Sequence, residues 1–217
     1  MVAEYQIDTE RFNEVFPYEI RREVEKYVYQ ATKGIETGQW GDRYVAYWSI
    51  IGKAFNRHHQ LPLGLPLLDD LFPPNIAVLD WLMGVDKSLS IADIGCGLGN
   101  LLPYLRELGF EKVCGYDTWI QIERWRAEQF LTAYGMEDCL VPYSILKKKH
   151  IDIITAISLP FRWIHADLYT LLAKAKYLLV DAGYMPDTPV EGYEEIGRYP
   201  NLLVVYQRVD NAQDSSR

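Results

Sequence analysis

The chain of 217 residues has little cysteine, no long apolar run and no excess of positive charge. Its three cysteines are odd in number and lie in segments expected to be buried, which argues against a disulfide framework and indicates reduced thiols. No apolar run reaches the ~18–20 residues that a membrane-spanning helix needs, and residues 1–10 lack the basic and apolar segments of a secretory signal. We therefore expect a cytoplasmic protein that does not cross a membrane.

Acidic residues outnumber basic ones, with 30 Asp and Glu against 22 Lys and Arg and a formal net charge of −8. A protein that follows a nucleic-acid backbone normally presents clustered positive charge. The one dense basic run, residues 147–150, suits a solvated loop before a strand. Nucleic acid is therefore not an expected partner. The chain also lacks the paired Cys or His spacings of protein-bound metal sites, so no metal is expected.

Aromatic residues are abundant, with 16 Tyr and 6 Trp, many of them within residues 1–50. The first 85 residues are predicted to be entirely helical, because apolar residues recur at helical spacing from Ile20 to Ala31 and from Val45 to Phe55. A further helix is expected over residues 75–83. We interpret residues 1–87 as an α-helical N-terminal extension.

Residues 88–217 show a different pattern, in which short apolar strands alternate with helices. Strands are expected at residues 89–94, 112–117, 139–143, 151–158 and 177–181, and an antiparallel pair at 194–199 and 202–208. Such alternation is typical of βαβ units and therefore of a parallel sheet with helices on both faces. The sequence thus predicts one α/β domain, residues 88–217, preceded by the extension.

The most informative segment is the glycine-rich sequence Asp93-Ile-Gly-Cys-Gly-Leu-Gly-Asn100, between the first expected strand of this domain and the helix after it. Glycines at such a junction let the backbone turn tightly and approach a ligand. The spacing is G-x-G-x-G, whereas dinucleotide-binding folds have G-x-G-x-x-G. Asp93 would repel a pyrophosphate but would favour an ammonium or sulfonium group. Asp117 ends the next strand, where a carboxylate can accept hydrogen bonds from ribose hydroxyls.

A cationic group and a ribose occur together in S-adenosylmethionine. Residues 89–208 resemble the class I, Rossmann-like S-adenosylmethionine-dependent methyltransferases in the loop Asp93–Gly99, the strand-ending Asp117 and the strand that begins at Ile151. The resemblance implies a seven-stranded sheet with an antiparallel last strand, S-adenosylmethionine as cofactor, and methyl transfer. The cofactor contacts that we expect come from Asp93, Gly95, Cys96, Gly97, Gly99, Asn100, Asp117, Thr118, Trp119, Ser144 and Ser158.

Two features depart from that family. An Asp that often binds the adenine amino group after the third strand is replaced by Tyr143-Ser144-Ile145, so adenine recognition there would depend on Ser144. The link from Asp181 to Glu194 is too short for the helix that many relatives have at this point. Enclosure of the substrate is therefore expected to depend on the N-terminal extension.

Methyl transfer from a sulfonium requires an aligned nucleophile, exclusion of water and, for some acceptors, removal of a proton. The sequence Ser158-Leu-Pro160-Phe161 resembles, imperfectly, the acceptor motif of amino-group methyltransferases, although Pro160 can also simply end a strand. The candidate bases are His58, His59 and His165. The candidate acceptor-pocket residues are Pro160, Phe161, Tyr44 and Tyr47, of which the two tyrosines suit a homodimer interface equally well.

The leading hypothesis is a cytoplasmic S-adenosylmethionine-dependent methyltransferase that acts on an oxygen or nitrogen of a small-molecule acceptor. In this hypothesis the extension serves as lid and acceptor site. Two alternatives stay open: a methyltransferase of proteins or peptides, and a non-catalytic protein that binds S-adenosylmethionine.

Overall fold

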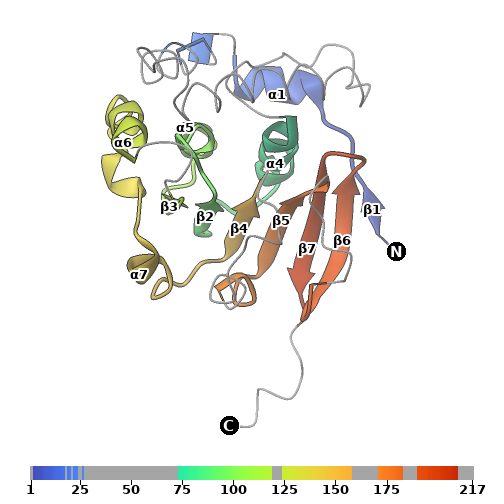
Figure 1. Cartoon of the computed structure of the whole chain (residues 1–217). Helices are drawn as coiled ribbons and strands as arrows, with labels where there is room; N and C mark the ends of the chain where they lie inside the picture. Colours follow the sequence, from blue (N-terminus) through green and yellow to red (C-terminus); the bar gives the residue numbers. More distant parts are fainter. Residues whose placement is uncertain are drawn as a thin grey trace, which may run out of the picture.

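The computed structural model describes residues 2–17, 19–20, 22–23, 26, 73–118, 124–157, 171–182 and 190–209. The described elements, labelled in Figure 1, are in chain order β1 (Ala3–Glu4), α1 (Thr9–Val15), α4 (Pro73–Met83), β2 (Ile91–Ile94), α5 (Leu101–Glu107), β3 (Val113–Tyr116), α6 (Arg124–Thr132), the 3-10 turn η1 (Glu137–Cys139), α7 (Tyr143–Leu146), β4 (Ile153–Ala156), β5 (Tyr177–Asp181), β6 (Tyr193–Tyr199) and β7 (Leu203–Arg208).

The described strands form one seven-stranded sheet in the order β1-β6-β7-β5-β4-β2-β3. Strands β3, β2, β4 and β5 are mutually parallel, whereas β7 is antiparallel to both of its neighbours, β5 and β6. The predicted α/β class with an antiparallel last strand is confirmed. The order reverses at β2, because the chain goes first to β3 on one side of it and later to β4 on the other. Open α/β sheets bind ligands at the carboxyl ends of the strands at such a point.

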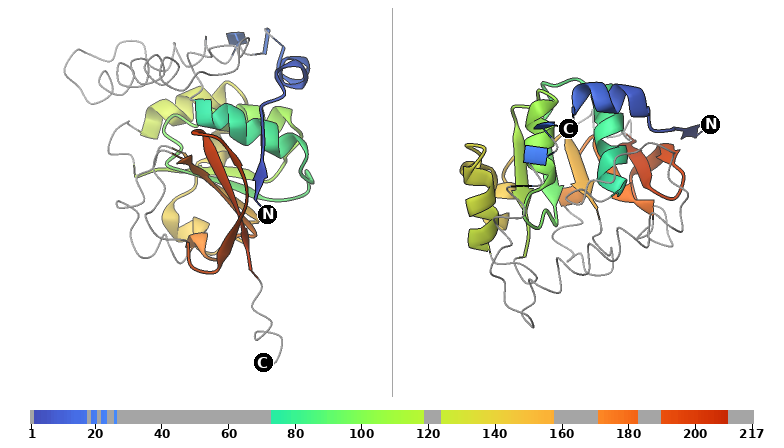
Figure 2. Two further views of the ribbon diagram at one scale, coloured as in Figure 1. Left: turned by 90° about the vertical axis from the view of Figure 1, so that its right-hand side faces the viewer. Right: turned by 90° about the horizontal axis from the view of Figure 1, so that it is seen from above.

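Helices cover both faces of the sheet, as Figure 2 shows from two further directions. Side chains of α1, α4, α5 and α6 join one buried cluster, and α7 contributes to the cluster on the opposite face. Successive residues of strand β5 belong to different buried clusters. Leu179 packs in the first cluster, and Leu178 and Val180 pack in the second. The apolar strand sequences are thus explained by burial on both sides.

The expectation that the first 85 residues are entirely helical is wrong, because β1 pairs in parallel with β6 at the edge of the sheet (Figure 1). The N–H of Tyr5 continues the pairing by donating to the Arg198 carbonyl at 2.8 Å. The Tyr5 ring lies over Gly197, where a Cβ atom would come within 2.1 Å of Tyr5 Cε2. The unpaired edge of β6 and the missing side chain at Gly197 make room for a strand that the local pattern does not predict.

The predicted strand over residues 139–143 is also absent. Residues on either side of Leu140 form η1 and α7, and Leu140 makes only an isolated parallel bridge to Gly115. Pro142 explains the interruption, because it has no N–H to donate to a neighbouring strand and because it caps α7. The seventh strand of the sheet is therefore β1 and not the expected third strand of the α/β domain.

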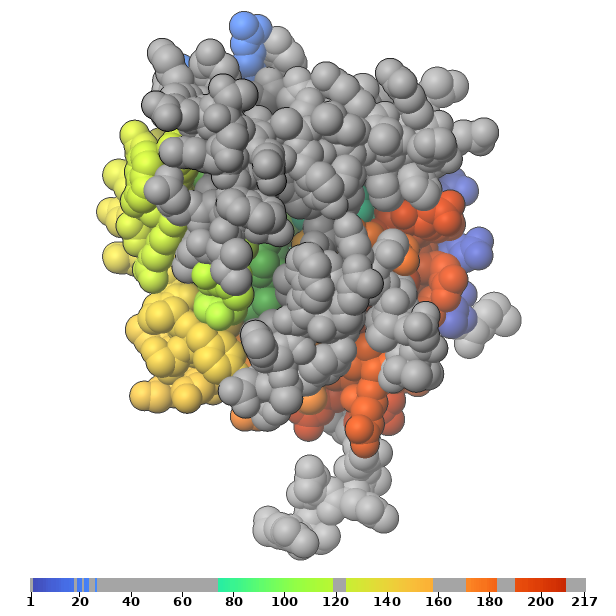
Figure 3. Space-filling view, in the orientation of Figure 1, coloured from blue at the N-terminus to red at the C-terminus, as the bar shows by residue number. Residues whose placement is uncertain are grey.

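The predicted helix over residues 75–83 is confirmed as α4, which begins two residues earlier at Pro73. The three cysteines, Cys96, Cys114 and Cys139, are buried and free, as expected. Among the described helices, none has the length and apolar character that would allow it to span a membrane. Figure 3 shows one face of the molecule in space-filling form.

Candidate functional site

A glycine-rich loop joins the carboxyl end of β2 to α5. Gly95, Gly97 and Gly99 have φ angles of 75°, 55° and 83°. This left-handed region is strained for residues with a Cβ atom, so glycine at these positions lets the loop turn back over the end of the strand. The loop thus forms where its spacing predicts it, at the point where the strand order reverses.

Backbone hydrogen bonds hold the loop against the end of β3. The N–H groups of Gly95 and Cys96 both donate to the Tyr116 carbonyl, at 2.7 and 3.2 Å. The N–H of Gly97 donates to Oδ2 of Asp117 at 2.9 Å. A loop that opens a helix is expected to offer its N–H groups to a ligand, but these three already have acceptors within the protein. The loop instead holds the Asp117 carboxylate beside it.

Asp93 lies at the base of the loop and is only 6% exposed. It is the direct partner of Thr155 in the register between β2 and β4, and Thr155 Oγ1 donates to Asp93 Oδ1 at 2.7 Å. Burial raises the pKa of Asp93 to about 7; the Thr155 hydrogen bond lowers this pKa and the charge of Asp117 raises it. A carboxyl group whose ionisation is opposed by burial and by a second carboxylate is stabilised as an anion when a cation binds beside it.

Cys96 is a buried residue of the loop, and its side chain packs against Gly115 of β3. A Cβ atom at Gly115 would lie 2.9 Å from Cys96 Sγ and 3.1 Å from Leu102 Cδ1. Burial, together with the charges of Asp93 and Asp117, raises the pKa of the Cys96 thiol well above its usual range. Cys96 is therefore a neutral packing residue at neutral pH and not a nucleophile.

Three other predicted cofactor residues lie in the described part of the chain. The Thr118 hydroxyl donates to Oδ1 of Asp117 at 3.4 Å, which places it at the site. Asn100 precedes α5 in a helical conformation, and its side chain does not cap that helix. Ser144 is exposed in α7, because the strand expected before it does not form. A contact from Ser144 to adenine stays a prediction.

The remaining predicted residues lie outside the described residues. They are the cofactor candidates Trp119 and Ser158, the acceptor candidates Tyr44, Tyr47, Pro160 and Phe161, and the candidate bases His58, His59 and His165. Of the predicted site, the structure brings together the glycine loop, Asp117 and Thr118, with Asp93 at the base of the loop.

Two residues of the site are missing from the sequence-based prediction. Thr155 is a polar residue in the otherwise apolar strand Ile153–Ala156, and this contrast is the signal that points to a buried partner. Gly115 is a glycine inside a strand, which often marks a close approach of another segment. Both signals exist in the sequence, but neither indicates which residue makes the contact.

The arrangement suits a ligand with a cationic group and with hydroxyl donors. Asp93 and Asp117 lie near the carboxyl ends of adjacent parallel strands, where Asp117 accepts from the N–H of Gly97 and Asp93 accepts from Thr155. Within the described residues, no group of three or more His, Cys, Asp or Glu side chains is arranged to hold a metal ion.

No family model matches the chain, and a search of curated proteins gives no match. Among solved structures, the chain is similar to an rRNA methylase from Escherichia coli, with 14% identity, a TM-score of 0.45, and coverage of 92% of this chain and 99% of that one. It is similar to the tRNA (uracil-54, C5)-methyltransferase of Pyrococcus abyssi in complex with S-adenosyl-L-homocysteine, with 14% identity, a TM-score of 0.41, and coverage of 62% and 37%.

A third similar structure is a SAM-dependent methyltransferase from Thiobacillus denitrificans in complex with S-adenosyl-L-homocysteine. Its identity to this chain is 18% and its TM-score is 0.37, with 51% of this chain and 48% of that chain covered. The chain thus spans about half the length of this relative and less of the Pyrococcus protein.

The expectation that nucleic acid is not a partner is wrong. The similar structures include methyltransferases of tRNA and of rRNA. The expectation rested on the net charge of the whole chain, whereas an acceptor meets the local field of one surface. The overall charge of −8 therefore does not decide the class of acceptor.

The identities and TM-scores are low, so the assignment of the fold rests on the chain's own strand order and glycine loop. The parallel strands β3, β2, β4 and β5, followed by an antiparallel β7 between β5 and β6, form the sheet that the resemblance implies, with its third strand reduced to one bridge. The chain has the fold of the class I S-adenosylmethionine-dependent methyltransferases.

Proposed function

We propose that the chain is a methyltransferase that binds S-adenosylmethionine at its glycine loop and at Asp117, which the loop holds beside it. The observation that carries this proposal is the pair of carboxyl groups, Asp93 and Asp117, at the ends of adjacent parallel strands beside three left-handed glycines. The raised pKa of Asp93 supports it, because burial opposes ionisation of this carboxyl group and a cationic ligand group beside it would favour the anion.

The roles of the residues follow from their chemistry. Asp93 would accept from the ammonium group of the methionine portion, and Asp117 from the ribose hydroxyls. Gly95–Gly99 would allow close approach of the backbone to the ligand. S-adenosylmethionine supplies a methyl group on a sulfonium, which is transferred to an oxygen or nitrogen of the acceptor.

The proposal also assigns a part of the chain to the methyl acceptor. We propose residues 1–87 as the part that covers the acceptor and residues 88–217 as the cofactor-binding domain. A small molecule is the first acceptor class to test, with peptides and RNA tested in parallel. A cytoplasmic location stays a prediction.

Calorimetric titration with S-adenosylmethionine and S-adenosylhomocysteine tests the cofactor assignment. We expect wild-type protein to bind both, and Asp117→Ala to weaken binding by about tenfold or more, since hydrogen bonds to a carboxylate are lost. Asp138→Asn, an exposed acidic residue of η1, is the matched control and should bind as wild type. Absence of binding by wild type, or unchanged binding by Asp117→Ala, would contradict the assignment.

Transfer of a radiolabelled methyl group tests the activity. Pools of metabolites, peptides and RNA are incubated separately with the protein and labelled S-adenosylmethionine. Label in one pool identifies the acceptor class. Binding of the cofactor without label in any pool would favour a non-catalytic protein and would contradict the proposed activity.

A further inference from the structure

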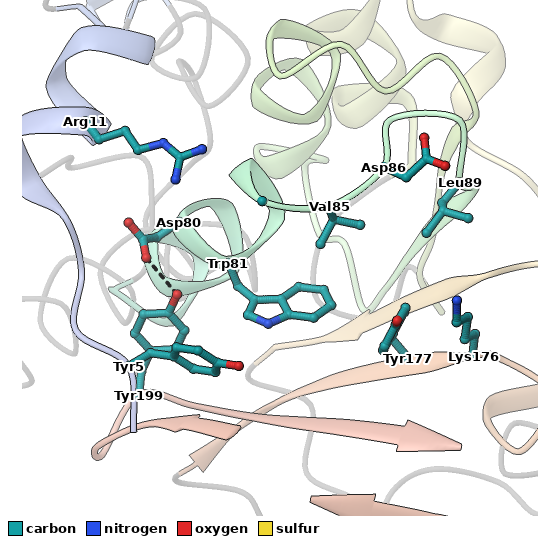
Figure 4. A pocket seen from close by; sticks show the side chains of 11 residues that line it. Tyr5, Arg11, Asp80, Trp81, Val85, Asp86, Leu89, Lys176, Tyr177 and Tyr199 are labelled. Atoms are coloured by element: carbon teal, nitrogen blue, oxygen red, sulfur yellow. Dashed lines mark hydrogen bonds between the residues drawn. The ribbon is translucent and has the colours of Figure 1, made fainter. Parts of the chain in front are cut away.

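A groove of about 550 Å³ lies beside α4 (Figure 4). It is lined by Asp80 and Trp81 of α4 and by residues of the segment after this helix, from Gly84 to Leu89. Leu89 precedes the amino end of β2, whereas the glycine loop follows the carboxyl end of the same strand. This end of the groove and the proposed cofactor site are therefore at opposite ends of β2. The volume lies in the range of pockets that hold small molecules.

Four aromatic rings form much of the groove. Tyr5 and Tyr199 lie together at one end, with ring centroids 5.3 Å apart. Trp81 and Tyr177 form an edge-to-face pair further along, also with centroids 5.3 Å apart. Figure 4 shows the Trp81 indole across the middle of the groove. Rings with faces and edges of this kind favour a planar, unsaturated ligand.

The carboxylates of the groove are already engaged by the protein. Asp80 accepts from the Asp8 N–H at 3.0 Å through Oδ1 and from the Tyr199 hydroxyl at 2.7 Å through Oδ2. Asp86 accepts from the Ser88 N–H at 2.9 Å. Asp80 in particular is a structural link between the N-terminal segment, α4 and β6, with no oxygen left without a donor.

The cations of the groove are not engaged in this way. Arg11 lies near Asp80 at one end of the groove, and Lys176 lies at the other end (Figure 4). Both are exposed, and within the part of the chain that the structure describes neither side chain forms a hydrogen bond or a close ion pair, although the charge of Arg11 acts on Asp80 and that of Lys176 on Asp86. The Lys176 ammonium lies 5.1 Å from the centroid of the Tyr177 ring. The groove therefore offers hydrogen-bond donors at both ends and aromatic rings between them.

We propose that this groove is a second ligand site, for a planar aromatic anion. The ring system of the ligand lies among Trp81 and the tyrosines, and its carboxylate or phosphate accepts from Arg11 or Lys176. The ligand is small enough to fit this groove, and its binding does not require S-adenosylmethionine. The site thus goes beyond the proposed methyl transfer.

Probes that share a ring and differ in charge test this proposal by calorimetry. Indole-3-acetate and 1-naphthyl phosphate are the anions, and indole-3-acetamide and 1-naphthol are their neutral counterparts. We expect each anion to bind about tenfold more tightly than its neutral counterpart, the gain of a charge-assisted hydrogen bond. The gain of each anion over its own neutral counterpart, compared between the two ring systems, shows whether the site favours a carboxylate or a phosphate. Each titration is repeated with excess S-adenosylhomocysteine, which should not compete.

The double variant Arg11→Gln, Lys176→Gln should lose the preference for the anions. Lys174→Gln, an exposed lysine outside the groove, is the matched control and should keep it. Binding of S-adenosylhomocysteine should be the same in all three proteins, so a failure of the cofactor assignment is seen separately. Absence of binding by both anions, equal binding of the neutral probes, competition by S-adenosylhomocysteine, or an unchanged preference in the double variant would overturn the proposal.

Discussion

Thr155 donates a hydrogen bond to Asp93 across the pair of strands β2 and β4, with 2.7 Å between Oγ1 and Oδ1. This bond lowers the pKa of Asp93, in opposition to burial and to the charge of Asp117. Thr155 is therefore a positioning residue that sets both the direction of the Asp93 carboxyl group and the pH at which it ionises.

Thr155→Val should shift the pH dependence of cofactor binding upward. Loss of the hydroxyl removes a bond that favours the ionised carboxylate, so the pKa of Asp93 rises above its value of about 7. Binding of S-adenosylhomocysteine by wild type should strengthen as pH rises through about 7, and the variant should need a higher pH. Titrations between pH 6 and pH 9 measure both midpoints, and Thr155→Ser is the control that keeps a hydroxyl. Equal midpoints for wild type and the valine variant would contradict this role.

Asp93→Asn should stabilise the ligand-free protein at alkaline pH. The pKa of Asp93 is raised from an ordinary value of 3.8 to about 7, so between these values the folded state binds more protons than the unfolded state. The free energy of unfolding of wild type therefore falls as pH rises through this window. Asparagine does not ionise, and the variant should gain on the order of 2–4 kcal/mol at pH 8 and much less near pH 4. Urea unfolding at the two pH values measures the difference, and equal stabilities at pH 8 would refute the prediction.

Gly115→Ala should destabilise the protein and weaken cofactor binding. The added methyl group would lie 2.9 Å from Cys96 Sγ and 3.1 Å from Leu102 Cδ1, so the loop must shift away from β3. Such overpacking costs about 1–3 kcal/mol. Gly84→Ala is a suitable control, since its new Cβ would meet no atom closer than 3.7 Å. Thermal unfolding and calorimetry should separate the two variants, and identical behaviour would show that the loop yields without cost.

Gly197→Ala should displace the Tyr5 ring and with it the edge strand β1. A Cβ atom there would be 2.1 Å from Tyr5 Cε2, so the Tyr5 ring must move away from β6. We expect a loss of about 1–3 kcal/mol in wild type and a smaller loss in a Tyr5→Ala background, because the two residues are coupled. Hydrogen exchange at the Tyr5 N–H, which donates to the Arg198 carbonyl, reports on β1 directly. Additive effects of the two substitutions would contradict the coupling.

The strands and the glycine loop could be predicted because their signals are local. β5 begins and ends at the predicted residues 177 and 181, since an apolar run between polar residues marks a strand that is buried on both faces. Gly95, Gly97 and Gly99 are explained by backbone angles that few other residues adopt.

The features that could not be predicted depend on residues far apart in the sequence. The strand β1 exists because the edge of β6 is open and Gly197 leaves room for Tyr5. The bond between Asp93 and Thr155 depends on the register of two strands that are 62 residues apart. The groove beside α4 is lined by residues as far apart in the sequence as Tyr5 and Tyr199, and no spacing of residues in the sequence predicts it.

The Tyr116 carbonyl, which accepts two hydrogen bonds from the glycine loop, has a consequence for the rate of ligand binding. Because Gly95 and Cys96 both donate to the Tyr116 carbonyl, and Gly97 to the carboxylate of the next residue, the loop and Asp117 form one pre-organised unit. A ligand that arrives there meets a receptor already close to its bound shape, and little ordering entropy remains to be lost on association. The observed association rate should then rise in proportion to ligand concentration, without the plateau that a slow rearrangement of the loop would impose.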